Sequence, residues 1–359
     1  MSINSNYALI GLMSGTSGDG LDIAYCHFIP NAQGWQFEIN KATTIPFPPS
    51  LREPLKTSHL LPSEELAVLD HQFGRWMGEE VKKYCVEYSL SPLAIASHGH
   101  TVFHRPEINL TKQIGNGYSL WQASGFPVIN DFRTLDVVLG GQGAPLVPIG
   151  DQLLFGNYDF ALNLGGIANI SMEKNGKRIA FDVCPFNLIF NYLSEKLGNS
   201  FDAGGKWAKE GQVIPTLLAK LEKLPYYKNP GAKSLGREDI EKHYLPLLKE
   251  KIFSVKDLMA TLSAHFVNQV AAPVLQHANK ENTILITGGG AYNDYFIERL
   301  SLKLENKVTV YKPEKNIIDF KEAMVFAFLG VLRIRGEINC LATVTGANKD
   351  SCGGTLFGF

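Results

Sequence analysis

The sequence predicts an α/β fold made of two lobes. Two apolar strands far apart in the chain each run into a glycine-rich polar turn and then resume as a strand, first over residues 9–28 and again over residues 162–171. A third apolar strand, residues 284–287, runs into three consecutive glycines. A chain of 359 residues is also longer than one hydrophobic core usually supports. These observations favour two related halves, each with its own sheet.

The composition excludes several classes of partner. Hydrophobic residues make up 45% of the chain and charged residues 19%, which is typical of a globular protein. The 34 Lys and Arg residues nearly balance the 35 Asp and Glu residues, so a net charge of -1 creates no field that attracts nucleic acid or anionic lipid. The five cysteines form no CxxC pair, and neither a signal-peptide layout nor a bilayer-length apolar run is present. We therefore expect a cytoplasmic protein without nucleic-acid or membrane partners.

In the first half, the glycine turn joins two strands. Dinucleotide-binding fingerprints and P-loops both place their phosphate turn before a helix, and the P-loop also needs a lysine that this turn lacks. Ser63 is expected to cap a helix with acidic residues in its first turn. The core face of this helix is marked by apolar residues at helical spacing: Leu66, Leu69, Phe73, Met77, Val81 and Tyr84. Strands follow at residues 93–97 and 127–129.

In the second half, residues 163–171 again predict strand, turn and strand, and residues 178–183 predict another strand. Residues 206–244 are rich in lysine, glycine and proline, which indicates a mobile lobe or lid. Ser254 is expected to cap a long apolar helix that Pro273 ends or kinks. Residues 283–287 predict a buried strand before the third glycine turn, and residues 322–332 predict an apolar helix. Asn293 is expected to stabilise that third turn.

The glycine turns point to phosphate binding, because glycine lets backbone amides approach an anion closely. In the first turn, residues 15–18 offer amide and hydroxyl donors for the β- and γ-phosphates of a nucleotide, and Asp19 suits magnesium held through water. Gly165 and Gly166 suit a second phosphate turn, and Gly288 to Gly290 suit contact with adenosine. A single turn of this kind is also compatible with a tight hairpin, whereas three turns at corresponding places favour a nucleotide.

Motifs along nearly the whole chain resemble those of the anhydro-N-acetylmuramic acid kinases, members of the sugar kinase, Hsp70 and actin superfamily. The first is Gly11-Leu12-Met13-Ser14-Gly15-Thr16-Ser17-x-Asp19-Gly20-x-Asp22. The others in the first half are Ser97-His98-Gly99-x-Thr101-Val102-x-His104-Arg105-Pro106, Gln113-Ile114-Gly115, Asp131-Phe132-Arg133-x-x-Asp136 and Gly140-Gly141-Gln142-Gly143-Ala144-Pro145-Leu146. The remainder are Leu162 to Ile170, Lys233-Ser234-x-Gly236-Arg237-Glu238, Gly288-Gly289-Gly290-Ala291-x-Asn293, Glu322-Ala323 and Thr345-Gly346-Ala347.

The resemblance implies a two-lobed actin-like (ribonuclease H-like, duplicated) sugar kinase fold with an interdomain cleft. Residues 1–155 and 334–359 would form the N-terminal lobe, and residues 156–333 the C-terminal lobe. The implied reaction is ATP- and Mg²⁺-dependent: the enzyme hydrolytically opens 1,6-anhydro-N-acetylmuramic acid and phosphorylates its 6-oxygen during peptidoglycan recycling. The family commonly forms homodimers.

The resemblance also implies roles for individual residues. The ATP-binding set is Gly15, Thr16, Ser17, Gly18, Asp19, Gly20, Leu21, Asp22, Asn163, Gly165, Gly166, Gly288, Gly289 and Gly290, with Asp19 also on the metal. The sugar-binding set is His98, Thr101, Arg133, Asp136, Gln142 and Asn187. Asp182 and Arg133 would be catalytic, with Asp182 activating the water that attacks the anomeric carbon.

Simpler structural roles stay open for several of these residues. An aspartate at a strand end, such as Asp182, often serves a turn or cap. Arg133 suits a carboxylate or phosphate, and a salt bridge with Asp131 or Asp136 is the alternative. His98, His100 and His104 share one parity, so on one continued strand they would face the same side as possible metal ligands, although no nearby carboxylate completes such a site.

The chain departs from the family pattern directly after Asp182. It has Val183, Cys184, Pro185, Phe186 and Asn187 where the family has Thr-Gly-Pro-Gly-Asn. Larger side chains at these positions would fill space beside the sugar and restrict the backbone. Two alternatives follow: a kinase for a related hexose or amino sugar, and a nucleotide-switched binding protein that no longer transfers phosphate.

Overall fold

The computed structural model describes residues 6–14, 20–228, 233–248, 252–278 and 281–359. The chain divides into two compact units, unit 1 (Met1–Gly156 and Phe320–Phe359) and unit 2 (Asn157–Asp319). The first boundary differs from the predicted one by a single residue. The chain returns to unit 1 at residue 320 instead of the predicted 334, because residues 320–335 pack on the sheet of unit 1.

Unit 1 is built on a sheet with the strand order β13-β7-β4-β1-β2-β3. Its strands are β1 (Tyr7–Ser14), β2 (Gly20–Asn31), β3 (Gly34–Pro46), β4 (Ala94–Ser97), β7 (Val128–Asn130) and β13 (Thr355–Phe357). β1, β2 and β3 are antiparallel neighbours, β4 lies parallel to β1, and β7 lies parallel to β4. A separate hairpin is formed by β5 (His100–Arg105) and β6 (Leu110–Ile114).

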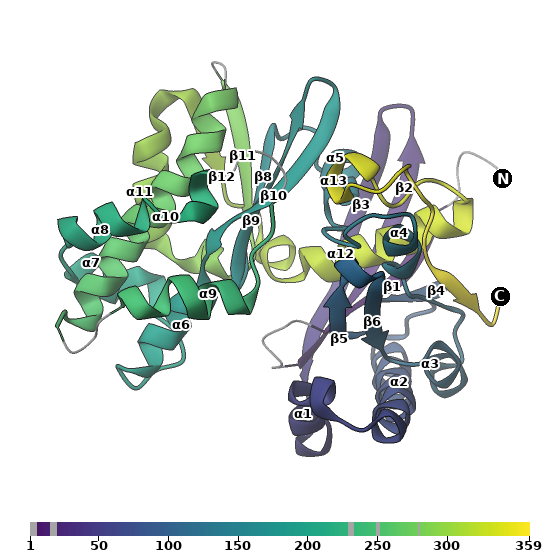
Figure 1. Cartoon of the computed structure of the whole chain (residues 1–359). Coiled ribbons are helices and arrows are strands. Elements are labelled where there is room, and N and C mark those ends of the chain that lie inside the picture. Colours follow the sequence, from purple (N-terminus) through teal and green to yellow (C-terminus); the bar gives the residue numbers. More distant parts are fainter. Residues whose placement is uncertain (1–5, 15–19, 229–232, 249–251, 279–280) are drawn as a thin grey trace. The chain divides into compact units, whose positions relative to one another are not determined.

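Unit 2 repeats this pattern with the strand order β10-β9-β8-β11-β12. Its strands are β8 (Phe160–Leu164), β9 (Ile167–Lys174), β10 (Lys177–Pro185), β11 (Asn282–Thr287) and β12 (Val308–Tyr311). β8, β9 and β10 are antiparallel, and β11 and β12 continue parallel to β8. Both sheets therefore share three antiparallel strands followed by two parallel ones, and unit 1 adds β13, which is antiparallel to β7. This shared pattern confirms the predicted duplicated α/β fold (Figure 1).

Helices surround both sheets. The α-helices of unit 1 are α1 (Pro49–Lys56), α2 (Ser63–Tyr88), α3 (Gly117–Ser124), α4 (Thr134–Val138), α5 (Pro148–Leu154) and α13 (Ala342–Thr345), and α12 (Lys315–Arg335) begins in unit 2 and ends in unit 1. The α-helices of unit 2 are α6 (Asn187–Glu195), α7 (Lys206–Glu210), α8 (Pro215–Leu221), α9 (Arg237–His243), α10 (Val255–His277) and α11 (Asp294–Leu304). Short 3-10 turns are η1 (Ser58–Leu60), η2 (Pro106–Ile108), η3 (Ala203–Gly205), η4 (Pro225–Lys228), η5 (Leu245–Leu247), η6 (Gly289–Tyr292) and η7 (Glu305–Lys307).

The core of unit 1 forms as the apolar pattern predicts. The α2 stripe is buried from Leu69 to Tyr84 and packs with residues of β1, β2 and β4. α12 packs very closely on the sheet, because a Cβ on Gly11 of β1 would lie 1.7 Å from the carbonyl oxygen of Ala323. Gly330 is similarly enclosed by Leu9 and Ala96.

This close approach predicts that Gly11→Ala strongly destabilises the protein. The added methyl overlaps backbone that cannot rotate away, so α12 must move off the sheet at a cost of about 3 kcal/mol. Gly125→Ala is the control: its methyl meets no atom within 4 Å, and its φ of +79° alone costs about 1 kcal/mol. Urea unfolding of the three proteins measures both costs. Equal losses for the two variants would contradict the prediction.

Three sequence-based expectations about helices need correction. Ser63 is the first residue of α2, and the N-cap is Pro62, which makes no side-chain cap. Pro273 does not end α10, which continues to His277, because packing of its apolar face outweighs one missing amide bond. The segment expected to be a mobile lobe or lid instead contributes α7, α8, η4 and α9 to unit 2, with Leu217, Leu221 and Ile240 buried in the core of that unit. The caps at Ser254 and Asn293 are confirmed.

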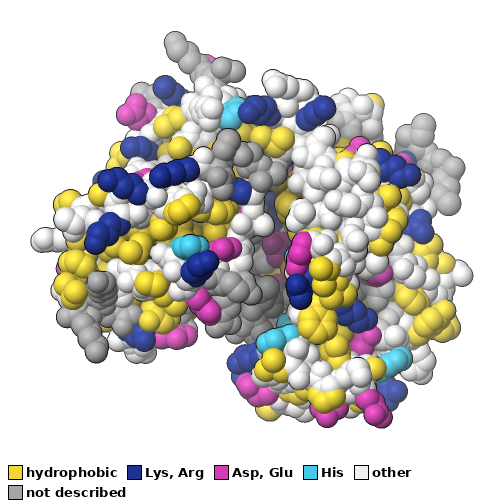
Figure 2. Space-filling model, in the orientation of Figure 1, with side chains coloured by type: hydrophobic (Ala, Val, Ile, Leu, Met, Phe, Trp, Pro, Cys, Tyr) yellow, Lys and Arg dark blue, Asp and Glu magenta, His cyan; other side chains and the backbone are white. Residues whose placement is uncertain are grey.

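One helix among the described residues, α10, has the length and apolar composition to cross a membrane. Two thirds of that apolar window (67%) is buried inside the protein, so α10 is a core helix of unit 2. On the face shown in Figure 2, Lys and Arg side chains are interspersed with Asp and Glu side chains. The surface visible there carries both signs of charge, in line with the balanced composition.

Candidate active site

The second and third glycine turns lie together at one end of the unit 2 sheet. β8 and β11 are parallel neighbours, so the turns that follow them meet at the same edge. Gly288 has a φ of +80°, and a Cβ there would lie 2.5 Å from Oδ1 of Asn163. A Cβ on Gly290 would lie 2.4 Å from the ring of Phe186 and 2.6 Å from Cβ of Leu164. Glycine is therefore required at both positions for the two turns to pack.

The second turn is anchored by the first turn of α6. The amides of Phe186 and Asn187 donate to the carbonyls of Gly166 and Gly165 over 2.8 and 3.2 Å. Nδ2 of Asn187 donates to the carbonyl of Leu164 (3.2 Å) and lies beside Gly289. Asn187, predicted to bind the sugar, is thus placed among the residues predicted to bind the nucleotide.

Asp182 lies on β10, the edge strand of the unit 2 sheet, at a β-bulge between Asp182 and Cys184. Its Oδ2 accepts a hydrogen bond from the amide of Leu235 (2.9 Å). Burial raises the pKa of the Asp182 carboxyl to about 6, and the Leu235 hydrogen bond opposes that rise. The carboxyl is therefore poised to exchange a proton near neutral pH, as a general base requires.

Arg133 follows β7 in unit 1 and is paired with His98, not with an acidic residue. Its Nε and Nη2 lie 3.0 and 2.8 Å from Nε2 of His98, and Nη1 donates to the carbonyl of Gly143 (2.6 Å). The alternative of a salt bridge to Asp131 or Asp136 was wrong for the described residues. Because arginine only donates, Nε2 of His98 must be the acceptor and Nδ1 carries the proton, which it donates to the carbonyl of Gly99 (2.9 Å).

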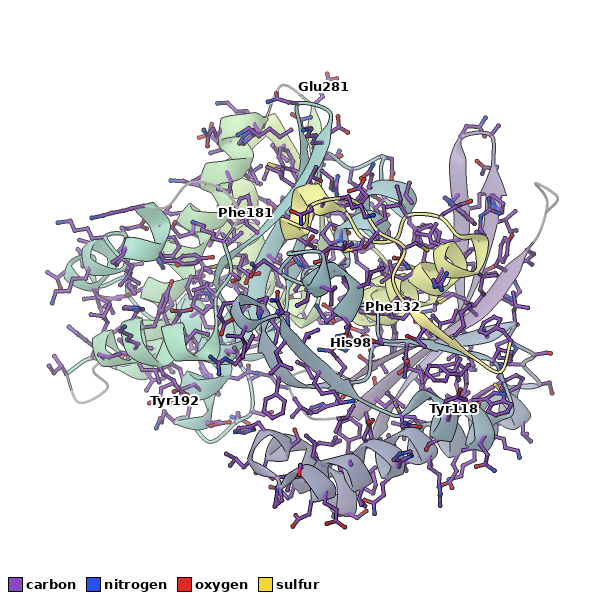
Figure 3. The ribbon with its side chains drawn as sticks, turned by 45° about the vertical axis from the view of Figure 1, so that its right-hand side comes forward. His98, Tyr118, Phe132, Phe181, Tyr192 and Glu281 are labelled. Atoms are coloured by element: carbon purple, nitrogen blue, oxygen red, sulfur yellow. The ribbon has the colours of Figure 1, made fainter. Side chains whose placement is uncertain are left out.

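The electrostatics of this pair follow from burial. Burial and the adjacent guanidinium hold the pKa of His98 well below its usual value, so the ring is neutral. Burial also lowers the pKa of Arg133 to about 10, which leaves it charged at neutral pH. The His98 ring packs on Phe326, as does Phe132, and Figure 3 shows His98 and Phe132 close together. Arg133 is thus a fixed cation on a rigid support.

Asp136 is an anchor inside unit 1. Its side chain is 1% exposed and accepts hydrogen bonds from the amide of Gly143 (2.7 Å), Oγ1 of Thr345 (2.7 Å) and Sγ of Cys340 (3.1 Å). These bonds join the glycine loop at residues 140–143 to the C-terminal segment. The carboxylate of Asp136 is therefore engaged within unit 1, and its contact with the sugar stays a prediction.

The remaining predicted sugar residues, Thr101 and Gln142, lie on a strand and a loop of unit 1. Thr101 is on β5 and accepts a long hydrogen bond from Gln113 (3.4 Å). Gln142 has an exposed side chain, and its amide donates to the carbonyl of Thr345 (2.8 Å). Both side chains are accessible from solvent at least in part.

The three histidines do not share one strand. Gly99 has a φ of +75° and separates β4 from β5, which belong to different sheets. His100 hydrogen-bonds with Oγ of Ser14 (3.0 Å) and His104 with Oγ1 of Thr111 (3.2 Å). The expectation of a shared face was therefore wrong, and the described residues contain no group of three or more His, Cys, Asp or Glu side chains suited to a metal.

Most of the first glycine turn, Gly15, Thr16, Ser17, Gly18 and Asp19, lies outside the described residues. Gly20 is the first residue of β2. A Cβ on Gly20 would lie 2.6 Å from the carbonyl oxygen of Ile45, so no side chain fits there. Leu21 is fully buried in the core and can offer only its backbone to a ligand. Oδ1 of Asp22 accepts a hydrogen bond from Oγ1 of Thr44 (2.6 Å).

Glu322 is a further candidate for a functional residue. The sequence analysis names it only as part of a motif and predicts no role for it. It lies near the start of α12, and its pKa is raised by burial and by the charge of Asp22, while Lys321 and Arg133 oppose the rise. Lys321 forms a buried ion pair with Asp151 (2.5 Å), which fixes the helix at this point. Glu322 thus brings a carboxyl close to the charge of Arg133, a proximity that only the folded chain shows.

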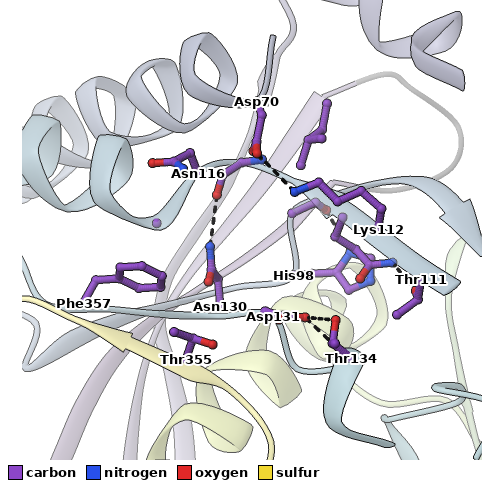
Figure 4. Close-up of a pocket in the computed structure, with 15 residues that line it drawn as sticks. Asp70, His98, Thr111, Lys112, Asn116, Asn130, Asp131, Thr134, Thr355 and Phe357 are labelled. Atoms are coloured by element: carbon purple, nitrogen blue, oxygen red, sulfur yellow. Dashed lines mark hydrogen bonds and ion pairs between the residues drawn. The ribbon is translucent and has the colours of Figure 1, made fainter. Parts of the chain in front are cut away.

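A polar pocket of about 200 Å³ lies within unit 1, and His98 is one of the residues that line it. Figure 4 shows Asp70 paired with Lys112 (3.2 Å), the amide of Asn130 bonded to the carbonyl of Gly115 (3.1 Å), and Asp131 bonded to Thr134. Phe357 closes one side of it. These side chains mostly hydrogen-bond to one another, so the pocket is a polar recess that includes His98, the partner of Arg133.

The residues that depart from the family pattern lie in the core of unit 2. Val183, Cys184 and Phe186 are at most 3% exposed. The Phe186 ring packs against Phe190, Phe266 and Phe296 at centroid distances of 5.2, 6.0 and 4.7 Å. The expectation that these side chains fill space beside the sugar was wrong, because they point into the hydrophobic core.

Comparisons with known proteins agree with the motifs. The family model described as anhydro-N-acetylmuramic acid kinase matches residues 7–358. Relatives with that same description include proteins of Aliivibrio fischeri, 33% identical over 97% of this chain and 98% of the relative, and of Actinobacillus pleuropneumoniae serotype 7, 34% identical over the same shares. Among solved structures, a ROK family glucokinase from Streptomyces griseus is 12% identical with a TM-score of 0.39, covering 89% of this chain and 97% of the glucokinase. The chain belongs to the anhydro-N-acetylmuramic acid kinase family.

Proposed function

We propose that this kinase opens the 1,6-anhydro bond of anhydro-N-acetylmuramic acid with water and transfers the γ-phosphoryl group of ATP to the freed 6-oxygen. The products are N-acetylmuramate 6-phosphate and ADP, as peptidoglycan recycling requires. The observation that carries the proposal is the state of Asp182: a partly buried carboxyl whose pKa is about 6, held by a backbone amide at the β-bulge of β10. A carboxylate in this state can take a proton from water near neutral pH.

In this proposal Asp182 removes the proton from the water that attacks the anomeric carbon. The bond between carbon 1 and the bridging 6-oxygen then breaks. The freed 6-oxygen takes the γ-phosphoryl group as the bond between that group and ADP breaks, while the proton from water stays on Asp182 until it is released to solvent. Arg133, charged and held in place by His98 and Gly143, is proposed to bind the lactyl carboxylate through its remaining N–H donors. Thr101, Gln142 and the loop anchored by Asp136 are proposed to surround the sugar.

The nucleotide is proposed to bind through the glycine turns. Gly288 and Gly290 occupy positions where any Cβ would overlap Asn163 or Phe186, so these glycines hold the second and third turns together at one edge of the sheet. Gly165, Gly166, Gly289 and Asn163 complete this part of the site in unit 2. Residues 15–22 are proposed to contact the β- and γ-phosphates.

Magnesium suits the oxygen ligands available, because it binds one or two carboxylates together with water and phosphate oxygens. Asp22, beside the first glycine turn and opposite Met13 in the β1–β2 register, offers such an oxygen, and Asp19 is proposed as the second carboxylate. When bound, the ion neutralises charge that develops on the phosphates.

Incubation with ATP, Mg²⁺ and anhydro-N-acetylmuramic acid tests the reaction. We expect phosphorus NMR to show a sugar 6-phosphate forming together with ADP. In ¹⁸O-enriched water, mass spectrometry should find the label on carbon 1 and none in the phosphate. Label in the phosphate, or turnover of a reducing hexose with none of the anhydro sugar, would contradict the proposal.

The two alternatives have less support. The alternative of a related hexose or amino sugar arose because residues 183–186 depart from the family pattern, but these side chains lie in the core. A nucleotide-switched binding protein would bind ADP without turnover of any sugar, and the poised carboxyl of Asp182 has no role in it. The proposal also includes a homodimer, whose mass light scattering would measure. It further includes a cytoplasmic location and the absence of nucleic-acid and membrane partners.

A further inference from the structure

A short backbone strap, defined here as Lys233 to Leu235, lies along Asp182. The amide of Asp182 donates to the carbonyl of Lys233 (2.9 Å), and the amide of Leu235 donates to Oδ2 of Asp182 (2.9 Å). Because β10 is an edge strand, its outward backbone groups have no strand partner on this side, and the strap satisfies them locally. The same strap therefore holds both the backbone and the carboxylate of Asp182.

Tyr226 also hydrogen-bonds to Asp182. Its hydroxyl donates to the carbonyl of Asp182 (2.7 Å). The amide, the carbonyl and one carboxylate oxygen of Asp182 are thus each bonded to the segment that runs from η4 to α9. These bonds fix the direction in which Oδ1, the other carboxylate oxygen, points.

Lys233 is clamped onto the tyrosines. Its Nζ lies 4.5 Å from the ring centroid of Tyr226 and 5.6 Å from that of Tyr227, and it donates to the carbonyl of Tyr226 (3.3 Å). The ammonium is therefore held by two ring faces and a carbonyl. Among the described residues, no ion pair joins Nζ of Lys233 to Asp182, so the Lys233 ammonium does not neutralise the Asp182 carboxylate.

We propose that Lys233 and Tyr226 are positioning residues for Asp182, and that their cation–π clamp keeps the strap closed so that the carboxylate stays desolvated and aimed. This inference rests on the proposed role of Asp182 as the base. Neither residue touches the sugar in this scheme: Lys233 acts through the strap, and Tyr226 acts through the backbone of Asp182.

The direction of the effect follows from the groups around Asp182. Among the described residues, Cys184 on β10 and Tyr226 on η4 interact electrostatically with Asp182, and Lys233 lies in the strap that is bonded to its backbone. Burial is the larger influence on the Asp182 pKa, and the Leu235 hydrogen bond is the smaller, opposing one. Opening the strap removes both, so the pKa should fall from about 6 toward its usual value.

Lys233→Met tests the clamp, and Lys233→Arg tests its rescue, because a guanidinium also stacks on aromatic rings. For Lys233→Met we expect kcat to fall at least tenfold and the acid limb of the kcat/KM profile to move below pH 6, with the KM for ATP unchanged. Lys233→Arg should restore both. Lys196→Met is the matched control, since Lys196 lies 4.7 Å over the ring of Tyr192 in the same unit, and it should behave as wild type.

The ring and the hydroxyl of Tyr226 can be separated. Tyr226→Phe keeps the ring for Lys233 and removes only the bond to the Asp182 carbonyl, so it should lower kcat with a smaller change in the acid limb. Tyr226→Leu removes the ring as well and should match Lys233→Met. Thermal unfolding of each variant shows whether the loss comes from general unfolding instead.

A substrate-free titration separates this inference from the proposed function. Carbon NMR of labelled aspartate, with the Asp182 signal assigned by its absence in Asp182→Asn, gives the pKa directly. If wild type turns over no anhydro sugar, the proposed function fails, yet a lower Asp182 pKa in Lys233→Met would still support the clamp. An Asp182 pKa that is the same in wild type, Lys233→Met and Tyr226→Leu would overturn the inference.

Discussion

Asp182→Asn is expected to reduce kcat by about a thousandfold or more, because the amide cannot accept the proton from the attacking water. The substitution keeps the shape of the side chain, and its Oδ1 can still accept the hydrogen bond from Leu235. Binding of ATP and of the sugar should change little, so the loss falls on kcat and not on KM. Single-turnover measurements with saturating ATP and sugar check this.

The dependence of wild-type kcat/KM on pH should show the titration of Asp182. Since the base must be ionised, kcat/KM should rise with pH and level off above about pH 6, the pKa of Asp182. Retention of more than a tenth of wild-type turnover by Asp182→Asn, or an acid limb that persists in this variant, would show that another group removes the proton. Glu322 is the candidate to examine in that case.

Stability should change in the opposite direction to activity. A carboxyl whose pKa is raised by folding binds its proton more tightly in the folded state, so its contribution to the free energy of unfolding is complete below pH 3.8 and is lost as pH rises through about 6. Asparagine avoids the cost of a buried charge. At pH 8, Asp182→Asn should therefore be more stable than wild type, by at most about 3 kcal/mol. Chemical unfolding at pH 4 and pH 8 measures the difference, which should nearly vanish at pH 4.

Arg133→Met carries the second large expected effect. The variant keeps much of the apolar stem and loses the charge-assisted hydrogen bonds to the sugar carboxylate, which are each worth about 2 kcal/mol. We expect kcat/KM for the sugar to fall at least a hundredfold while the KM for ATP stays close to that of wild type. Steady-state kinetics with each substrate varied in turn check this split.

Arg105→Met is the matched control for Arg133→Met. Arg105 is exposed on unit 1, and its ion pair with Glu107 is a surface contact of little energetic value. A sugar analogue without the lactyl carboxylate gives a further check, because it should lose affinity for wild type but not for Arg133→Met. An equal loss for both proteins would place Arg133 elsewhere than on the carboxylate.

The sequence alone determined the fold class and the family. Apolar periodicity located the buried stripe of α2, and the paired strand-turn-strand openings indicated two sheets of the same topology. These features are local: they depend on residues within one element, so they survive without knowledge of the partners. The motifs likewise marked the glycine turns, Asp182 and Arg133 by their position in the chain.

Only the tertiary structure decided which partners these residues have. Arg133 is held by His98, Asp136 is bonded to Thr345, which is 209 residues away, and Asp182 is bonded to Leu235, 53 residues away. It also showed that Phe186 is a core side chain and that residues 320–335 belong with unit 1. The physical reason is that hydrogen bonding and desolvation depend on distances through space. The charge state of a carboxyl or an imidazole is therefore set by neighbours that its own stretch of sequence does not contain.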